Sequence, residues 1–194
     1  MTNLKMLAVW LSRINHCRGF GVQSPSAYRF IRYVINEHYP YYAYDELRKE
    51  LPHIDLLTRK RMELYFRIAN FRQASLWIDY CRRDDNIAIY VQRGCQATRV
   101  MNICDSKHVI DNSKIEVLRI CPIDGCDTIL DVALKHVDDC TLFIIEDIGY
   151  NDTAKRLWQT LHESNLTSVS YDLYYLGIAF FDRKRFKNNY IVNF

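Results

Sequence analysis

Glycine is scarce in this 194-residue chain: it occurs six times, and none occurs between Gly21 and Gly94. Loops that wrap closely around a ligand rely on glycine for positive φ angles and close backbone approach. A glycine-rich ligand loop is therefore excluded from that interval. The sequence also lacks an apolar run long enough to cross a membrane, and the short apolar stretch at residues 6–11 does not have the length of a secretory signal. We expect a cytoplasmic protein without membrane association.

Cysteine pairs with the spacing of a zinc site are lacking as well. Seven cysteines are scattered along the chain, and the closest two, Cys121 and Cys126, are five positions apart with Pro122 between them. Because no secretory signal precedes them, we expect reduced thiols, most of which serve as small core residues.

The formal net charge of +3 is unevenly distributed. Residues 1–100 carry 16 Lys and Arg against 9 Asp and Glu, whereas residues 101–194 carry 10 against 14. A basic half is compatible with nucleic acid or an acidic partner. However, the basic run from Arg59 to Arg61 lacks the interleaved aromatic residues that stack on bases. We expect a solvated helix face there and no nucleic-acid partner.

The order of hydrophobic patterns predicts one domain, with a helical N-terminal cap at residues 1–73 and an α/β core at residues 74–194. Helical spacing and cap residues predict helices at 3–15, 24–39, 45–51, 58–72, 86–92, 128–137 and 151–162. Apolar runs predict strands at 76–80, 98–104, 114–123, 141–148, 168–174, 176–181 and 190–194. The last three strands have no helix between them, which indicates an antiparallel hairpin or meander. The tyrosines at positions 39, 41, 42 and 44 either pack between helices or line a pocket.

The strand at 141–148 is the centre of the predicted sheet, because its apolar residues do not alternate with polar ones. It ends in two adjacent carboxylates, Glu146 and Asp147. In open α/β sheets, ligands bind outside the carboxyl ends of the strands. These two acids are therefore the first candidates for a functional site.

Six short motifs follow one another along the chain. The N-terminal segments at 19–25 and 41–46 read GFGVQSP and YYAYDE, and the later segments at 123–125, 144–148, 168–173 and 177–181 read IDG, IIEDI, SVSYDL and GIAFF. In this order they resemble the motifs of a bacterial family of class I S-adenosylmethionine-dependent methyltransferases. Residues 74–118 match the family poorly. The resemblance implies a Rossmann-like sheet, mostly parallel, with antiparallel C-terminal strands.

The resemblance also implies where S-adenosylmethionine would bind. The family closes its first strand with an acidic residue and a glycine-rich turn, at the position where this chain reads DYCRRDD from residue 79 to 85. The cofactor candidates are Asp79 and Cys81, with Asp105 as the acid after the second strand. Because every glycine of the turn is missing, this chain resembles a degenerate member of the family.

Asp124, Glu146 and Asp147 are the candidates on the substrate side, since they follow neighbouring strands. In catechol-type O-methyltransferases, carboxylates at such strand ends hold a divalent cation, and oxygen ligands of this kind suit magnesium or calcium. The alternative is that these acids cap the helices that follow them. We favour the capping role and expect no metal.

Two functions remain open from the sequence. The first is an S-adenosylmethionine-dependent methyltransferase-like protein that acts on a small molecule. The alternative is a catalytically inactive pseudoenzyme, which keeps the fold and binds a small molecule or a protein partner, since a fold does not carry its function once the site is lost.

Overall fold

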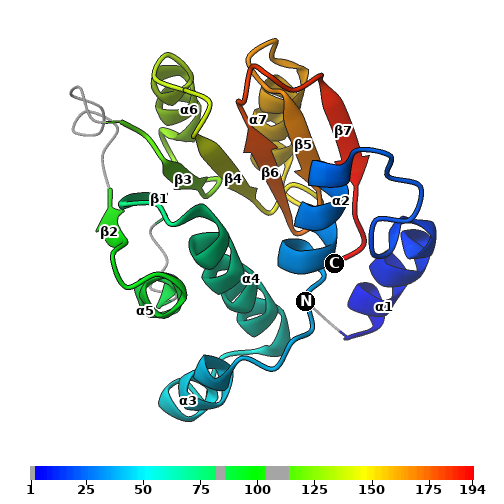
Figure 1. The fold of residues 1–194 in the computed structure, drawn as a ribbon, viewed down its shortest axis with the longest axis vertical. Helices are drawn as coiled ribbons and strands as arrows, with labels where there is room; N and C mark the ends of the chain where they lie inside the picture. The colour runs from blue at the N-terminus through cyan, green and yellow to red at the C-terminus, as the bar shows by residue number, and fades with distance from the viewer. Residues whose placement is uncertain (1–2, 82–85, 104–113) are drawn as a thin grey trace.

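The computed structural model describes residues 3–81, 86–103 and 114–194, which form an α/β fold around one mixed sheet (Figure 1). Within these residues the sheet has seven strands in the order β2-β1-β3-β4-β6-β5-β7. The strands are β1 (Leu76–Tyr80), β2 (Arg99–Asn102), β3 (Val117–Ile120), β4 (Leu142–Glu146), β5 (Val169–Asp172), β6 (Leu176–Phe180) and β7 (Asn188–Ile191). Strand β4 lies in the middle, and all five of its residues are buried, as its unbroken apolar run predicted.

All strands but β6 run in the same direction. Strands β2, β1, β3 and β4 pair in parallel, and β6 pairs antiparallel with both β4 and β5. The predicted hairpin is thus confirmed for β5 and β6. The expected antiparallel pairing of the last strand is wrong, because β7 pairs with β5 in parallel. Both edges of β6 are already occupied by β4 and β5, so that β7 can add only to the outer edge of β5.

Helices cover both faces of the sheet (Figure 1). One face carries α2 (Pro25–Phe30) with its π-helical extension η2 (Ile31–Ile35), α3 (Tyr42–Glu50), α4 (Leu56–Arg72) and α5 (Ile87–Gly94). The opposite face carries α6 (Cys126–Leu134) and α7 (Asp152–Glu163). Helix α1 (Asn3–Ser12) and the short 3-10 helix η1 (Ile14–His16) lie beside the C-terminus, where the Asn193 backbone N–H donates to the His16 carbonyl at 3.0 Å.

Helix α4 is a 17-residue helix that packs on the same face of the sheet as α5. It begins where the Asp55 carboxylate accepts hydrogen bonds from the backbone of Leu57 and Thr58, at 3.0 and 3.2 Å. It ends at Gln73, whose φ of 50° is left-handed. The helix shares one hydrophobic core with the strands. The predicted helical cap at residues 1–73 and the predicted α/β core at residues 74–194 therefore do not have separate hydrophobic cores.

Close backbone approach explains one of the few glycines. A Cβ atom on Gly94 would lie 2.2 Å from the Phe66 carbonyl oxygen of α4. Gly94 is the last residue of α5, and its lack of a side chain lets that helix pack against α4. None of the helices in the described ranges has the length and apolarity that a membrane span requires.

Candidate functional site

The carboxyl ends of β1, β3 and β4 bring three charged side chains to the face that α4 covers. Asp79 and Arg119 are directly opposite each other in the register of β1 and β3. Glu146 is the last residue of β4, and it shares a face with Ile144 two positions earlier. The apolar residues that precede these three on the same face belong to the core beneath α4. The charged residues therefore form the end of that core.

Arg119 lies between two carboxylates and is 1% exposed. Its Nε donates to Glu146 Oε1 at 2.9 Å, and its Nη1 donates to Asp79 Oδ1 and Oδ2 at 3.1 and 3.3 Å. Its guanidinium also lies 5.1 Å from the centre of the Tyr65 ring. Two strand-end acids are thus paired with a cation that comes from the strand between them.

Helix α4 supplies a second cation and a hydroxyl group. Arg61 Nη1 donates to Glu146 Oε2 and to Asp147 Oδ1, both at 3.0 Å. The Tyr65 hydroxyl donates to Glu146 Oε1. Glu146, which is completely buried, therefore accepts on both of its carboxylate oxygens.

The network continues into the turn that follows β4. Asp147 has a φ of 63°, a left-handed conformation that is costly for a residue other than glycine. Its backbone N–H donates to the Tyr175 carbonyl at 2.7 Å, and its carboxylate accepts from Arg61 and from the Tyr150 hydroxyl. These bonds hold the turn in its strained conformation.

Burial and neighbouring charge fix the protonation states of this cluster. Burial raises the pKa of Tyr65 well above its ordinary value, and the Glu146 charge raises it further. Burial likewise raises the pKa of Tyr150 to about 12. Burial by itself lowers the pKa of Arg61, but Glu146, Tyr65, Tyr150 and Asp147 together outweigh it and raise that pKa overall. At neutral pH both tyrosines are therefore hydrogen-bond donors, and Arg61 is a cation.

The sequence candidates meet only in part. Asp79, Glu146 and Asp147 do converge, through their shared arginine partners. Asp124 is exposed, and its backbone carbonyl accepts a hydrogen bond at 2.7 Å from the hydroxyl of Tyr80, which belongs to the core on the opposite face of the sheet. Asp105 lies outside the described residues.

Cys81, a candidate for cofactor binding, forms a disulfide with Cys121. The expectation that the cysteines are reduced is wrong for these two. The residues before them, Tyr80 and Ile120, are register partners in β1 and β3, so the next position of each strand brings the two Cα atoms to 5.1 Å. The described cysteines that remain free are Cys17, Cys95, Cys126 and Cys140.

The helix-capping alternative is wrong for Glu146 and Asp147, the two acids at the end of β4. The Glu146 and Asp147 side chains accept from arginine and tyrosine, whereas α7 is capped by Asn151, whose side chain accepts from the Ala154 N–H at 3.0 Å. In the described part of the chain no three His, Cys, Asp or Glu side chains gather in a way that could hold a metal ion.

Sequence reasoning missed the partners of these acids. Arg61 was expected on a solvated helix face, but it is 7% exposed, because the carboxylates of Glu146 and Asp147 draw it inward. Arg119 carried a usable signal: a lone charge inside the apolar run Val117–Ile120 predicts a buried ion pair. Tyr65 and Tyr150 carried none, since tyrosine is common in helix faces and turns.

The comparisons with known proteins leave the family open. No protein-family model matches the chain, and no curated protein matches it.

Proposed function

We propose that this chain is a small-molecule-binding protein without methyltransferase activity, built on a Rossmann-like sheet of the methyltransferase type. The arrangement of the sheet supports the fold part of this proposal. Four parallel strands, β2, β1, β3 and β4, are followed in the sheet by β6. Strand β6 is antiparallel and lies between β4 and β5, and the resemblance of the sequence motifs implies antiparallel strands in this C-terminal part of the chain.

The observation that carries the functional part is the burial of Arg119 between Asp79 and Glu146. In the methyltransferases that the sequence motifs resemble, the acid at the end of the first strand serves the cofactor. Here the Asp79 carboxylate is 1% exposed and is bonded to Arg119. Cys81 is likewise held in a disulfide. Of the residues that were candidates for S-adenosylmethionine, the described ones do not fit the cofactor, because they are engaged with the protein itself.

Binding of S-adenosylmethionine and S-adenosylhomocysteine tests this proposal. Calorimetric titration up to millimolar concentration should give no binding heat, and neither ligand should raise the melting temperature. The variant Asp79→Asn should melt at a lower temperature than the parent protein, because it weakens the ion pair with Arg119, and it should respond to the ligands no differently.

Micromolar binding of S-adenosylmethionine, weakened by Asp79→Asn, would overturn the proposal. It would mean that Arg119 releases the carboxylate to the cofactor, and the methyltransferase interpretation would then take its place.

A further inference from the structure

A cavity of about 450 Å³ lies at the opposite end of α4 from the ion-pair network. It is bounded by α2, α4 and the end of β6, at the amino ends of the parallel strands. Its walls combine aromatic rings from Phe30, Phe71 and Phe180 with the side chains of Arg29, Arg67 and Arg185. Among the described residues that line it there is no aspartate or glutamate.

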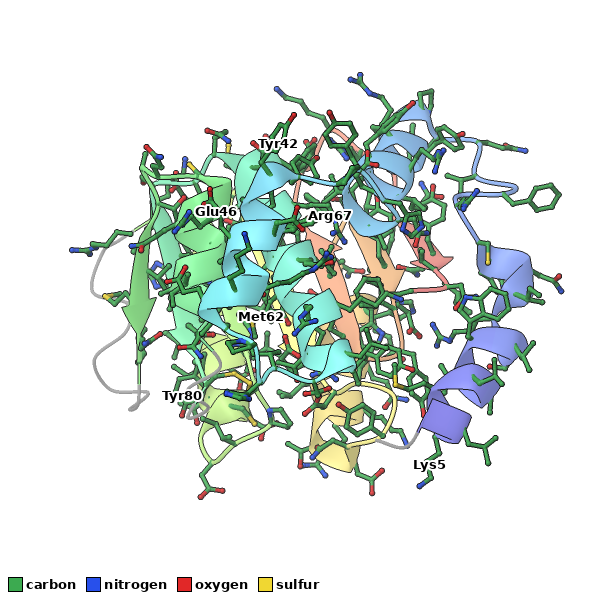
Figure 2. The ribbon with its side chains drawn as sticks, turned by 90° about the horizontal axis from the view of Figure 1, so that it is seen from below. Lys5, Tyr42, Glu46, Met62, Arg67 and Tyr80 are labelled. Carbon is green, nitrogen blue, oxygen red and sulfur yellow. A yellow bond between two sulfur atoms is a disulfide. The ribbon has the colours of Figure 1, made fainter. Side chains whose placement is uncertain are left out.

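Arg67 is the most informative of the three arginines because it is a buried cation, only 6% exposed. It projects from α4 (Figure 2) toward η2, where its Nε donates to the Val34 carbonyl at 2.6 Å and its Nη2 to the Ile35 carbonyl at 3.2 Å. Its Nη1 donates to the Tyr44 hydroxyl at 3.1 Å. Every donor group has an acceptor, but all three acceptors are uncharged.

The charge of Arg67 therefore has only partial compensation. The carbonyls at the end of η2 carry the partial negative charge of a helix C-terminus. Burial raises the pKa of Tyr44 to about 12, so its hydroxyl supplies no negative charge at neutral pH. No carboxylate of the described chain lies within 4.0 Å of the Arg67 guanidinium, and a buried cation without a counter-ion is costly.

The other two arginines add to the positive potential. Arg29 is exposed on α2 and, within the described residues, also has no carboxylate partner. Arg185 is paired with Asp182 at 2.9 Å, so it contributes less net charge. Among the described residues, two of the three guanidinium groups at the cavity thus have no carboxylate counter-ion.

The aromatic residues that line the cavity favour a ligand with a flat apolar group. The Phe30 ring packs edge-on against Phe71 and Phe180, with ring centres 5.2 and 5.0 Å apart. Aromatic walls of this kind accept a flat apolar group, and the cavity volume lies within the range of small-molecule sites. Guanidinium groups favour phosphate and carboxylate, which they bind in a bidentate manner.

We propose that this cavity binds a small aromatic anion, a molecule that joins a ring to a phosphate or carboxylate group. The ring would lie against Phe30 and Phe71, and the anionic group would face Arg29 and Arg67. This inference supplies the ligand class for the binding function proposed above. Its test uses a different part of the molecule, so the two can fail separately.

The probe is 1-naphthyl phosphate, titrated into the protein by calorimetry at low salt. Two partial probes separate the contributions: 1-naphthol has the ring without the charge, and inorganic phosphate has the charge without the ring. We expect the joined probe to bind at least about tenfold more tightly than either part, because both the charged hydrogen bonds and the stacking are then made.

Matched variants on one helical segment locate the site. Arg29→Gln should weaken binding of 1-naphthyl phosphate about tenfold, because an exposed charge at the cavity is removed while Arg67 stays in place. Arg32→Gln removes the same charge from the next turn of the same segment, at a residue that does not line the cavity, and should leave binding unchanged.

Three results would overturn the inference. They are no binding of 1-naphthyl phosphate at millimolar concentration, equal binding of 1-naphthol, and equal weakening by Arg29→Gln and Arg32→Gln. The last would indicate general attraction to a basic surface. None of these results bears on S-adenosylmethionine, whose binding would overturn the proposed function instead.

Discussion

At the scale of single residues, the most consequential position is Arg119. It is a charged side chain in the middle of a sheet. The fold can bury this charge because Asp79 and Glu146 flank it and pair with it. Buried pairs of this kind add little net stability compared with an apolar core. Removing one partner is nevertheless strongly destabilising, because the other charge is left without compensation.

Replacing Arg119 by methionine should therefore lower the free energy of unfolding by about 3–5 kcal/mol. Urea denaturation followed by circular dichroism measures this loss. Adding Asp79→Asn to the variant should recover part of it, since one of the two stranded charges is then gone.

Arg99→Met is the matched control, because Arg99 is exposed on the neighbouring strand β2. We expect this change to stay within about 0.5 kcal/mol. If Arg119→Met lowers the free energy of unfolding by less than about 1 kcal/mol, Asp79 and Glu146 do not depend on Arg119 to compensate their charges.

At the scale of elements, α4 links the two sites, with Arg61 and Tyr65 toward the ion-pair network and Arg67 and Phe71 toward the cavity. Residues 61 and 67 are six positions apart, which corresponds to about 9 Å along the helix axis. The N-terminus of this helix depends on Asp55, whose carboxylate accepts from two backbone N–H groups. The stability of α4 should therefore depend on the ionisation of Asp55.

The pH dependence of the Asp55 cap has a definite sign. A hydrogen bond from the Thr58 side chain, together with those from the Thr58 and Leu57 backbone, lowers the pKa of Asp55 below its ordinary 3.8. A lowered pKa in the folded state means that the cap stabilises the protein above the ordinary pKa. This stabilisation is lost as the pH falls through the folded value.

Asp55→Ala should accordingly cost about 1 kcal/mol at pH 7, and the difference from the parent protein should narrow as the pH falls below about 4. Unfolding in urea at a series of pH values measures it. Asp131→Ala, an exposed acid within α6, is the control and should show neither the cost nor the narrowing. A difference that stays constant down to pH 3 would contradict the capping role of the ionised carboxylate.

At the scale of the whole molecule, the Cys81–Cys121 disulfide joins β1 to β3 across 40 residues of chain. The segment between the two cysteines includes α5 and β2, so the bond closes this part of the chain into a covalent loop. A cross-link over this length restricts the unfolded chain and stabilises the fold by about 4 kcal/mol in the chain-entropy account.

Reduction should therefore lower the unfolding midpoint of the parent protein, as measured in urea with and without dithiothreitol. The double variant Cys81→Ala/Cys121→Ala should unfold at the same midpoint under both conditions. Labelling of thiols in the unreduced, denatured protein should leave Cys81 and Cys121 unlabelled. Labelling of both cysteines would show that the bond does not form.

The sequence by itself determined most of the elements and their order. Strand β1 has the bounds that its apolar run predicted, β4 is central and fully buried, and Ser24-Pro25 begins α2 as its cap and first residue. These features follow from local patterns, since apolar runs, helical spacing and cap residues act within a few positions of the chain. The sequence also identified the strand ends at which acids meet.

Only the tertiary structure decided what those acids do. The partners of Glu146 lie 27 positions away at Arg119 and 85 positions away at Arg61, and no local pattern connects them. The pairing of Cys81 with Cys121, the parallel placement of β7 and the burial of Arg67 depend in the same way on neighbours that are distant in sequence. Charge compensation and strand pairing are properties of side chains that meet in space, and they therefore become visible only once the chain has folded.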